Sequence, residues 1–331
     1  MNAVNAVAGV SAVAGAADAL LEASVVGSFS RIGISVRSRL LPEFTADSRP
    51  PARGRVALVT GATSGLGRAT ACDLARRGWI VHFLARSDRR AADAQREISQ
   101  AAGGSQVSYG LADMEDLESV RAFARDFLAG HDRLDVLIQA SGAIYPRFGV
   151  TKAGIERTVA GQVVAPFALT EMLLPALRAA APARVVTVSS GGMYTQRLDP
   201  SALEMPPSAY RGVTAYARAK RAQVALSREW ARRTDPAEVA FHAMHPGWAA
   251  TPGITASLPG FSRAMGPLLR SAEQGADTIV WLATADPVLL GSGRFWLDRR
   301  PRAEYVLPWT RAHDPAAADR LWDWVAQAAR C

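Results

Sequence analysis

Short apolar runs alternate with longer amphipathic stretches along most of this chain, and this alternation restricts the fold more than any other feature. The runs are rich in Val and Ile and lie at 55–60, 79–85, 105–112, 134–140, 183–190, 239–246 and 293–298. Stretches of helical length and spacing lie between them, for example at 65–77, 115–129, 152–180 and 214–233. Apolar strands separated by helices predict an α/β fold with a doubly wound parallel sheet.

The two ends of the chain are expected to lie outside this pattern. Residues 1–52 predict a helical N-terminal extension that ends in the proline-bearing linker "LPEFTADSRPPARG", and residues 53–331 predict a single domain. The Ala- and Val-rich stretch 6–27 contains Asp18 and Glu22, which favours an amphipathic helix over a membrane span. A peripheral membrane contact through residues 1–30 stays open. The C-terminal "LWDWVAQAAR" predicts an amphipathic helix that packs on the domain or on a second subunit of a homo-oligomer.

Charge and cysteine content narrow the classes of partner. The formal net charge is +8, but the arginines are scattered and form no long basic run, so we expect no nucleic-acid partner. A basic balance also suits a protein that holds an anionic cofactor. The two cysteines, Cys72 and Cys331, lie in no metal-ligand or disulfide pattern. We therefore expect a cytoplasmic protein without a metal site.

A glycine-rich loop follows the first apolar run. Its sequence is "TGATSGLG" (60–67), and it joins the apolar run "VALV" to a predicted helix. Glycines at such a junction let a pyrophosphate approach the backbone N–H groups and the helix N-terminus. A plain turn without ligand is the alternative. The residues expected to contact the cofactor here are Gly61, Thr63, Ser64, Gly65, Leu66 and Gly67.

The second apolar run ends at "FLARSDRR", where a dinucleotide site selects its ribose. An acidic residue at this place binds the ribose hydroxyls of NAD(H), whereas an arginine accepts the 2′-phosphate of NADP(H). The chain has Arg86 and Ser87 here. We therefore predict NADP(H) as the cofactor, with a solvated, arginine-rich helix start as the alternative.

Three side chains further along are candidates for proton transfer. Tyr216 and Lys220 in "YARAK" are four residues apart, which places both on one face of a helix. A lysine cation favours the tyrosinate, so we expect Lys220 to lower the pKa of Tyr216. Ser190 in "VVTVSSGG" lies at the carboxyl end of a predicted strand, where it can hydrogen-bond a substrate carbonyl.

Taken together, these motifs resemble the short-chain dehydrogenase/reductase family, and the resemblance covers roughly residues 54–300. It implies a Rossmann fold whose nucleotide loop is "TGATSGLG". Asp113 in "ADM" matches the aspartate that contacts the adenine. "HPGWAATPG" (245–253) matches the family's Pro-Gly segment, and it implies cofactor contacts for Pro246, Gly247 and Thr251.

The same resemblance assigns the catalytic roles. Tyr216 is implied as the general acid or base, and Ser190 as the residue that positions the carbonyl. Lys220 is implied to bind the nicotinamide ribose. The motifs "SSGGMY", "HPGWAATPG" and "SAEQGADTIVWLA" resemble the branch called dehydrogenase/reductase family member 12, with retinol-dehydrogenase-like reductases close in pattern.

Two positions depart from the family pattern. The stretch after the fourth run usually reads Asn-Asn-Ala-Gly, but here it reads "QASG", with Gln139 followed by Ala140, Ser141 and Gly142 near the cofactor. The catalytic asparagine of the next helix aligns with Gln162. Glutamine has the same amide one methylene farther out, so the proton relay is in question.

These features predict an NADP(H)-dependent oxidoreductase that interconverts a carbonyl and an alcohol of a small molecule. Residues 250–267 are expected to form a lid over the substrate. Their apolar side chains, Leu258, Phe261 and Met265, favour an apolar substrate. The rival hypothesis is a non-catalytic nucleotide-binding or interaction protein on the same fold, since one fold hosts many functions.

Overall fold

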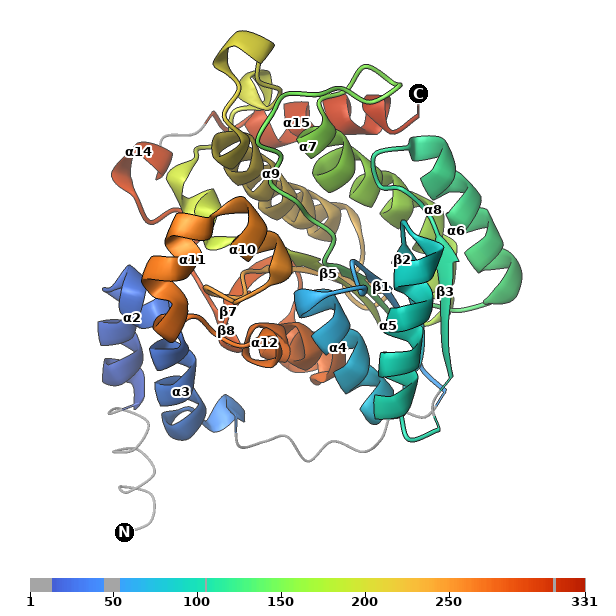
Figure 1. Cartoon of the computed structure of the whole chain (residues 1–331), viewed down its shortest axis with the longest axis horizontal. Coiled ribbons are helices and arrows are strands. Elements are labelled where there is room, and N and C mark those ends of the chain that lie inside the picture. The colour runs from blue at the N-terminus through green and yellow to red at the C-terminus, as the bar shows by residue number, and fades with distance from the viewer. Residues whose placement is uncertain (1–13, 45–53, 105, 312–313, 331) are drawn as a thin grey trace.

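One mostly parallel sheet organises the protein, as the sequence predicts (Figure 1). The computed structural model describes residues 14–44, 54–104, 106–311 and 314–330. Among these residues eight strands follow the order β3-β2-β1-β4-β5-β6-β7-β8. Their bounds are β1 (Val56–Thr60), β2 (Ile80–Ala85), β3 (Val107–Leu111), β4 (Val136–Gln139), β5 (Ala183–Val188), β6 (Val239–Met244), β7 (Arg294–Leu297) and β8 (Arg300–Pro301). The pairs from β3 to β7 are parallel, and only the short β8, which was not predicted, is antiparallel.

Helices cover both faces of the sheet, which explains why the strands are continuously apolar. Successive residues of β1 alternate between two cores, with Val56 and Leu58 in one and Ala57 and Val59 in the other. The first core is closed by α6 (Leu117–Gly130), α8 (Ala165–Ala179) and α9 (Gly212–Arg233). The second is closed by α4 (Gly65–Arg76), α5 (Asp88–Ala101) and α12 (Ala272–Thr284).

Capping hydrogen bonds determine where helices begin, and the apolar sequence pattern did not predict these positions to the residue. The helix predicted from residue 152 begins only at α7 (Arg157–Val159), because the Glu156 carboxylate accepts from the backbone N–H groups of Thr158 and Val159. A capping box between Ser271 and Gln274 starts α12. Most predicted strands were one or two residues too long at their ends.

The C-terminal helix α15 (Ala317–Ala328) packs on its own chain, which the sequence had left open. The Trp322 ring lies 4.9 Å from the Phe167 ring of α8 and 4.7 Å from the Trp230 ring of α9, centroid to centroid. Trp324 is partly buried against the same core. These contacts cover the outer side of α8 and α9.

The single helix predicted over residues 6–27 is wrong within its described part. A helical segment over 14–22 stops, and a new helix α2 (Val25–Phe29) begins after Ser24, whose Oγ accepts from the Gly27 N–H at 3.0 Å. Ser30 caps the next helix, α3 (Arg31–Leu40), in the same way. The 3₁₀ turn Pro42–Phe44 follows, and both the first part of the predicted helix and linker residues 45–53 lie outside the described residues.

One helical run, Arg157–Ala179, is long and apolar enough to cross a membrane by composition. Within the fold, 78% of its most apolar window is buried. The run therefore behaves as a core helix packed under the sheet.

Candidate functional site

A cleft of about 550 Å³ opens at the carboxyl ends of the parallel strands. It lies where the strand order reverses between β1 and β4, the usual ligand position in doubly wound sheets. Every site residue predicted from the sequence lines this cleft: Gly61, Thr63, Ser64, Gly65, Leu66, Gly67, Arg86, Ser87, Asp113, Ala140, Ser141, Gly142, Gln162, Ser190, Tyr216, Lys220, Pro246, Gly247 and Thr251. Geometry thus brings them together, while their roles stay predictions.

The glycine loop is held close to the neighbouring strand end by the Thr60 side chain and by close backbone packing. The Thr60 hydroxyl accepts from the N–H groups of Ala140 and Ser141, each at 3.1 Å. Gly61 has a φ of 74°, and a Cβ there would lie 2.9 Å from the Ala140 carbonyl oxygen. A Cβ on Gly67 would lie only 2.4 Å from the carbonyl oxygen of Gly61. No larger residue fits at Gly67 without moving the loop.

Arg86 and Asp113 lie at the far end of the cleft from Tyr216. The Arg86 side chain is 63% exposed, with one nitrogen 3.7 Å from the Glu115 carboxylate. Asp113 accepts from the backbone N–H of Glu115 at 3.0 Å. Arg90 also lines the cleft near Arg86. An anionic group on the ribose would therefore meet solvated cations, because β2 itself contains no carboxylate.

Sequence reasoning missed a polar cluster on this wall of the cleft. The Glu115 carboxylate accepts from the Tyr145 hydroxyl at 2.5 Å and from Arg157 Nε at 2.6 Å, and all three residues line the cleft. The Arg157 guanidinium stacks 4.5 Å from the centre of the Tyr145 ring. These contacts hold the pKa of Glu115 below its usual value, against the effect of burial. Only the position of Glu115 two residues after Asp113 hinted at this cluster.

The catalytic candidates meet at the opposite end of the cleft. Tyr216 and Lys220 lie one turn apart on α9, and Lys220 Nζ is 5.4 Å from the centre of the Tyr216 ring. Ser190 follows β5, and its hydroxyl hydrogen-bonds with Tyr216. The Ser190 Oγ also accepts from the Gly192 N–H at 3.2 Å. A carbonyl oxygen between the Ser190 and Tyr216 hydroxyls could receive hydrogen bonds from both.

The pKa values at this end differ from the sequence expectation. Burial raises the pKa of Tyr216, and the hydrogen bond with Ser190 lowers it to a smaller extent. Burial also lowers the pKa of Lys220 to about 7, so this lysine is a weaker cation than one in water. The expected net lowering of the pKa of Tyr216 is therefore not found in this structure, because burial dominates this pKa. Tyr216 is a protonated phenol at neutral pH.

Lys220 is held by a glutamine that the sequence analysis did not name. Its ammonium donates to the Val188 carbonyl at 2.9 Å and to Gln223 Oε1 at 3.1 Å. Gln223 Nε2 in turn donates to the backbone carbonyl of Gln162 at 2.6 Å. That carbonyl lies four residues before Pro166, which has no N–H to offer it. Gln223 therefore connects Lys220 on α9 to the helical segment that contains Gln162 and continues into α8.

Gln162 itself lies in a π-helical turn, Ala160–Val164, between α7 and α8. Such turns are frequent at functional sites. The Gln162 Nε2 donates to the Ala143 carbonyl at 2.7 Å, while its Oε1 is buried and has no hydrogen-bond partner among the described residues. A Cβ on Gly142 would lie 3.1 Å from this Oε1 and 3.3 Å from Lys220 Nζ. The side-chain amide of Gln162 thus makes no direct hydrogen bond to the lysine.

Gln139, the other departure, has a structural role. Its Nε2 donates to the Pro166 carbonyl at 2.9 Å and to the Thr170 hydroxyl at 2.7 Å. Its Oε1 accepts from the Thr187 hydroxyl at 3.0 Å. The side chain is buried, so it joins β4, β5 and α8 beneath the cleft.

The wall after β6 carries the predicted Pro-Gly segment and leads into the lid. Gly247 has a φ of 71°, and a Cβ there would lie 2.4 Å from Arg270 Nε. The Thr251 hydroxyl caps α10 (Pro252–Ser257) by accepting from the Ile254 N–H. The lid continues as α11 (Pro259–Met265). Ile254 lines the cleft, whereas Leu258, Phe261 and Met265 do not, which differs from the expectation for these three side chains.

The residues present fit a dinucleotide. The missing Cβ atoms of Gly61 and Gly67 leave backbone N–H groups at the start of α4 open to the cleft. The unpartnered Gln162 Oε1 and the partly neutral Lys220 lie at the other end. The cleft is thus polar at both ends, and it is continuous between them.

Known proteins with similar sequences point to one family. A family model described as short chain dehydrogenase matches residues 55–259. Dehydrogenase/reductase SDR family member 12 of Homo sapiens is 38% identical over 278 residues, which is 84% of this chain and 87% of that protein. Retinol dehydrogenase 12 of Homo sapiens is 34% identical over 272 residues, 82% of this chain and 84% of that protein. The resemblance to the member 12 branch is confirmed.

Solved structures agree with this fold. An uncharacterized protein from Mycobacterium paratuberculosis superposes with a TM-score of 0.66 at 29% identity, over 86% of this chain and 96% of that one. A protein described as an NAD(P) dependent gluconate 5-dehydrogenase from Beutenbergia cavernae, with NADP bound at low occupancy, has a TM-score of 0.62 at 28% identity. It covers 75% of this chain and 96% of its own.

Proposed function

This chain belongs to the short-chain dehydrogenase/reductase family, and we propose that it is an NADP(H)-dependent reductase of apolar carbonyl compounds. The observation that carries the proposal is the arrangement of Ser190, Tyr216 and Lys220 at one end of a cleft whose other end offers Arg86. When bound, NADPH supplies the hydride. The protein has to orient the carbonyl and deliver a proton.

Tyr216 acts as the proton donor in this proposal. Its raised pKa keeps the phenol protonated at neutral pH, which favours reduction over oxidation. Ser190 donates to the same carbonyl oxygen and fixes its position. Lys220 contributes a partial positive charge and holds the nicotinamide ribose, while Gln162 and Gln223 keep the lysine in place through the π-helical turn.

Arg86 supports NADP(H) over NAD(H). No carboxylate of β2 competes for the ribose, and the 63% exposed guanidinium can turn from Glu115 to a 2′-phosphate. The NADP bound to the Beutenbergia cavernae protein agrees with this choice. The apolar Ile254 and Ala249 in the lining of the cleft, and the name of retinol dehydrogenase 12, support an apolar substrate.

A cytoplasmic location, a homo-oligomer and a membrane contact near the N-terminus stay predictions. The exposed side chains of Leu20 (75%) and Val25 (58%) support a surface contact of the N-terminal helices. Changing both to Ser and following co-sedimentation with liposomes tests it. Point changes are preferable to deletion of residues 1–30, because residues 28–30 hold other parts of the fold.

The first test is a fluorescence titration of the protein with NADPH and NADH. We expect tighter binding of NADPH by about tenfold or more, since a 2′-phosphate adds charge-assisted hydrogen bonds. Equal or tighter NADH binding would contradict the NADP(H) assignment. No binding of either would favour a protein that uses this fold for interaction only.

The second test is Tyr216→Phe, assayed with a panel of apolar ketones and aldehydes. Loss of the proton donor should lower kcat by about 10²- to 10⁴-fold, while the NADPH dissociation constant stays nearly unchanged. Tyr210→Phe is a suitable control, because the Tyr210 hydroxyl bonds the Tyr145 carbonyl at 3.2 Å outside the catalytic end. Retained turnover in Tyr216→Phe would refute the role of this tyrosine.

A further inference from the structure

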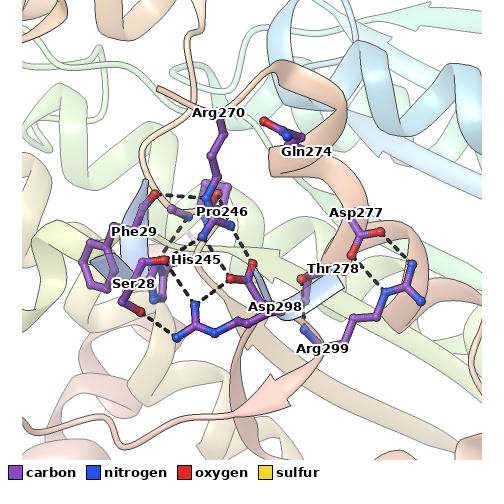
Figure 2. A network of polar contacts seen from close by, with 12 residues as sticks. Ser28, Phe29, His245, Pro246, Arg270, Gln274, Asp277, Thr278, Asp298 and Arg299 are labelled. Carbon is purple, nitrogen blue, oxygen red and sulfur yellow. Dashed lines mark hydrogen bonds and ion pairs between the residues drawn. The ribbon is translucent and has the colours of Figure 1, made fainter. Parts of the chain in front are cut away.

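A buried group of three charges joins segments that are far apart in the sequence (Figure 2). Arg37 of α3, Arg270 at the end of the lid and Asp298 of the β7–β8 turn have side chains only 1% exposed. One Asp298 oxygen accepts from Arg37 at 2.7 Å and the other from Arg270 at 2.6 Å. Because a lone buried charge is costly, all three residues must stay together. The N-terminal helices are therefore fixed to the core beside the lid.

The Arg270 side chain also donates hydrogen bonds to backbone carbonyls at the end of α2. Its guanidinium donates to Ser28 O at 2.8 Å, to Phe29 O at 3.0 Å and to Ser30 O at 3.1 Å. It also donates to Pro246 O at 3.3 Å, which belongs to the wall of the cleft (Figure 2). One side chain thus links the N-terminal segment 28–30 to the Pro-Gly segment.

Backbone hydrogen bonds close the base of the lid at the same place. The Arg270 N–H donates to Trp248 O at 2.7 Å, and the Ala250 N–H donates to Arg270 O at 2.8 Å. The Trp248 N–H donates to Phe29 O at 2.7 Å. The two ends of the lid are therefore tied to each other and to Phe29.

The Phe29 ring fills the space between two walls of the catalytic end. It lies 4.5 Å from the His245 ring and 6.0 Å from the rings of Trp248 and Tyr194. A Cβ on Gly191 would lie 2.5 Å from Phe29 Cε2. Gly191 directly follows the serine of the site, and His245 is the first residue of the Pro-Gly segment. The Phe29 ring, which belongs to the N-terminal extension, thus packs against both the loop after Ser190 and the start of the Pro-Gly segment.

We propose that Phe29 is a positioning residue for the catalytic end: it holds the loop of Ser190 and the base of the lid at a fixed separation. The kinetic part of this proposal rests on the proposed reductase activity. Phe29 touches neither the glycine loop nor Arg86 in any contact that the structure records, so we expect its largest effect at the catalytic end of the cleft. A small displacement of a catalytic wall is enough to lower the rate strongly.

Phe29→Ala tests the proposal by two independent measurements. We expect kcat to fall by about 10- to 100-fold, as for a misplaced catalytic group, while the NADPH dissociation constant changes by less than about threefold. Hydrogen exchange should accelerate in peptides covering 245–272 and 189–196, and stay unchanged in peptides covering 56–76. The exchange result does not depend on any activity, so it still tests the packing role if the reductase proposal fails.

Phe44→Ala is the matched control. Phe44 belongs to the same N-terminal extension, and its ring packs 4.5 Å from the Arg299 guanidinium, away from the cleft. This variant should leave kcat and the exchange of 245–272 unchanged. Phe29→Leu keeps part of the ring volume, so it should retain a higher kcat than Phe29→Ala. If Phe29→Ala fails to fold, the same measurements can be made on Phe29→Leu.

Two outcomes would overturn the proposal. One is unchanged exchange in 245–272 in both Phe29 variants. The other is exchange that accelerates equally in all peptides, including 56–76, since Phe29 would then only support overall stability.

Discussion

The two ends of the cleft are built in different ways. The glycine-loop part of the nucleotide end is made from consecutive residues: β1, the loop with Gly61 and Gly67, and the start of α4 all lie within one strand–loop–helix unit. The catalytic end is assembled from distant segments, and the bond between Arg270 and Phe29 joins residues 241 positions apart. One end is therefore a local backbone structure, whereas the other depends on the packing of the whole chain.

This difference predicts different responses to mutation. A backbone site of consecutive residues fails when a side chain is added, because the space that the ligand and the loop require is lost. A site assembled from distant segments fails when a packed side chain or a buried hydrogen bond is removed, because its parts then move relative to one another. Each expectation can be tested at one end while the other end serves as the internal control.

Among the changes that compare the two ends, the largest effect is expected for Gly67→Ala at the nucleotide end. The new Cβ would lie 2.4 Å from Gly61 O, so the loop must move. Overpacking of this kind costs about 1–3 kcal/mol, which corresponds to a loss of NADPH affinity of about 5- to 150-fold. Titration with NADPH measures the loss, and exchange of peptides covering 189–196 should not change.

Gly130→Ala is the control for this change. Gly130 is the last residue of α6, and a Cβ there meets no atom within 4 Å. It should bind NADPH like the unmodified protein. Normal NADPH binding by Gly67→Ala would show that the loop is not the phosphate site.

A smaller effect is expected for Gln223→Leu at the catalytic end. Burial already lowers the pKa of Lys220 to about 7, and this change removes an acceptor that stabilises the ammonium, so the pKa should fall further. Lys220 then loses its proton at lower pH. If the cation supports turnover, the alkaline limb of the pH–rate profile shifts to lower pH, and kcat at pH 7 falls by about tenfold.

Gln223→Glu should shift the same limb to higher pH, because a carboxylate near Lys220 Nζ stabilises the cation. Gln95→Leu is the control, since Gln95 donates to the Val107 carbonyl at 2.8 Å on the far side of the sheet. An unchanged profile in both Gln223 variants would mean that Lys220 does not titrate in the rate-limiting state.

The sequence predicted the short-motif residues at both ends of the cleft and missed the contacts that support them, and both results have one reason. Gly61, Arg86 and Tyr216 belong to short motifs whose geometry follows from one strand end or one helix turn. Gln223 accepts directly from Lys220 and also donates to a carbonyl that Pro166 leaves free in another helical segment, and no local spacing reveals this second bond. The error about the pKa of Tyr216 is of this kind, because spacing shows a neighbour but not the burial that outweighs it.

The smallest effect is expected for Arg86→Ala, and it tests whether the nucleotide end is entirely a backbone site. Arg86 is 63% exposed and pairs only loosely with Glu115, at 3.7 Å, so solvent screens much of its charge. We expect NADPH affinity to fall by about five- to tenfold and NADH affinity to stay unchanged, since NADH has no 2′-phosphate. Equal losses for both cofactors would show that Arg86 supports the loop rather than the phosphate. No loss for either cofactor would mean that Arg90 or the backbone selects NADPH. The nucleotide end would then not depend on the cationic side chain of Arg86.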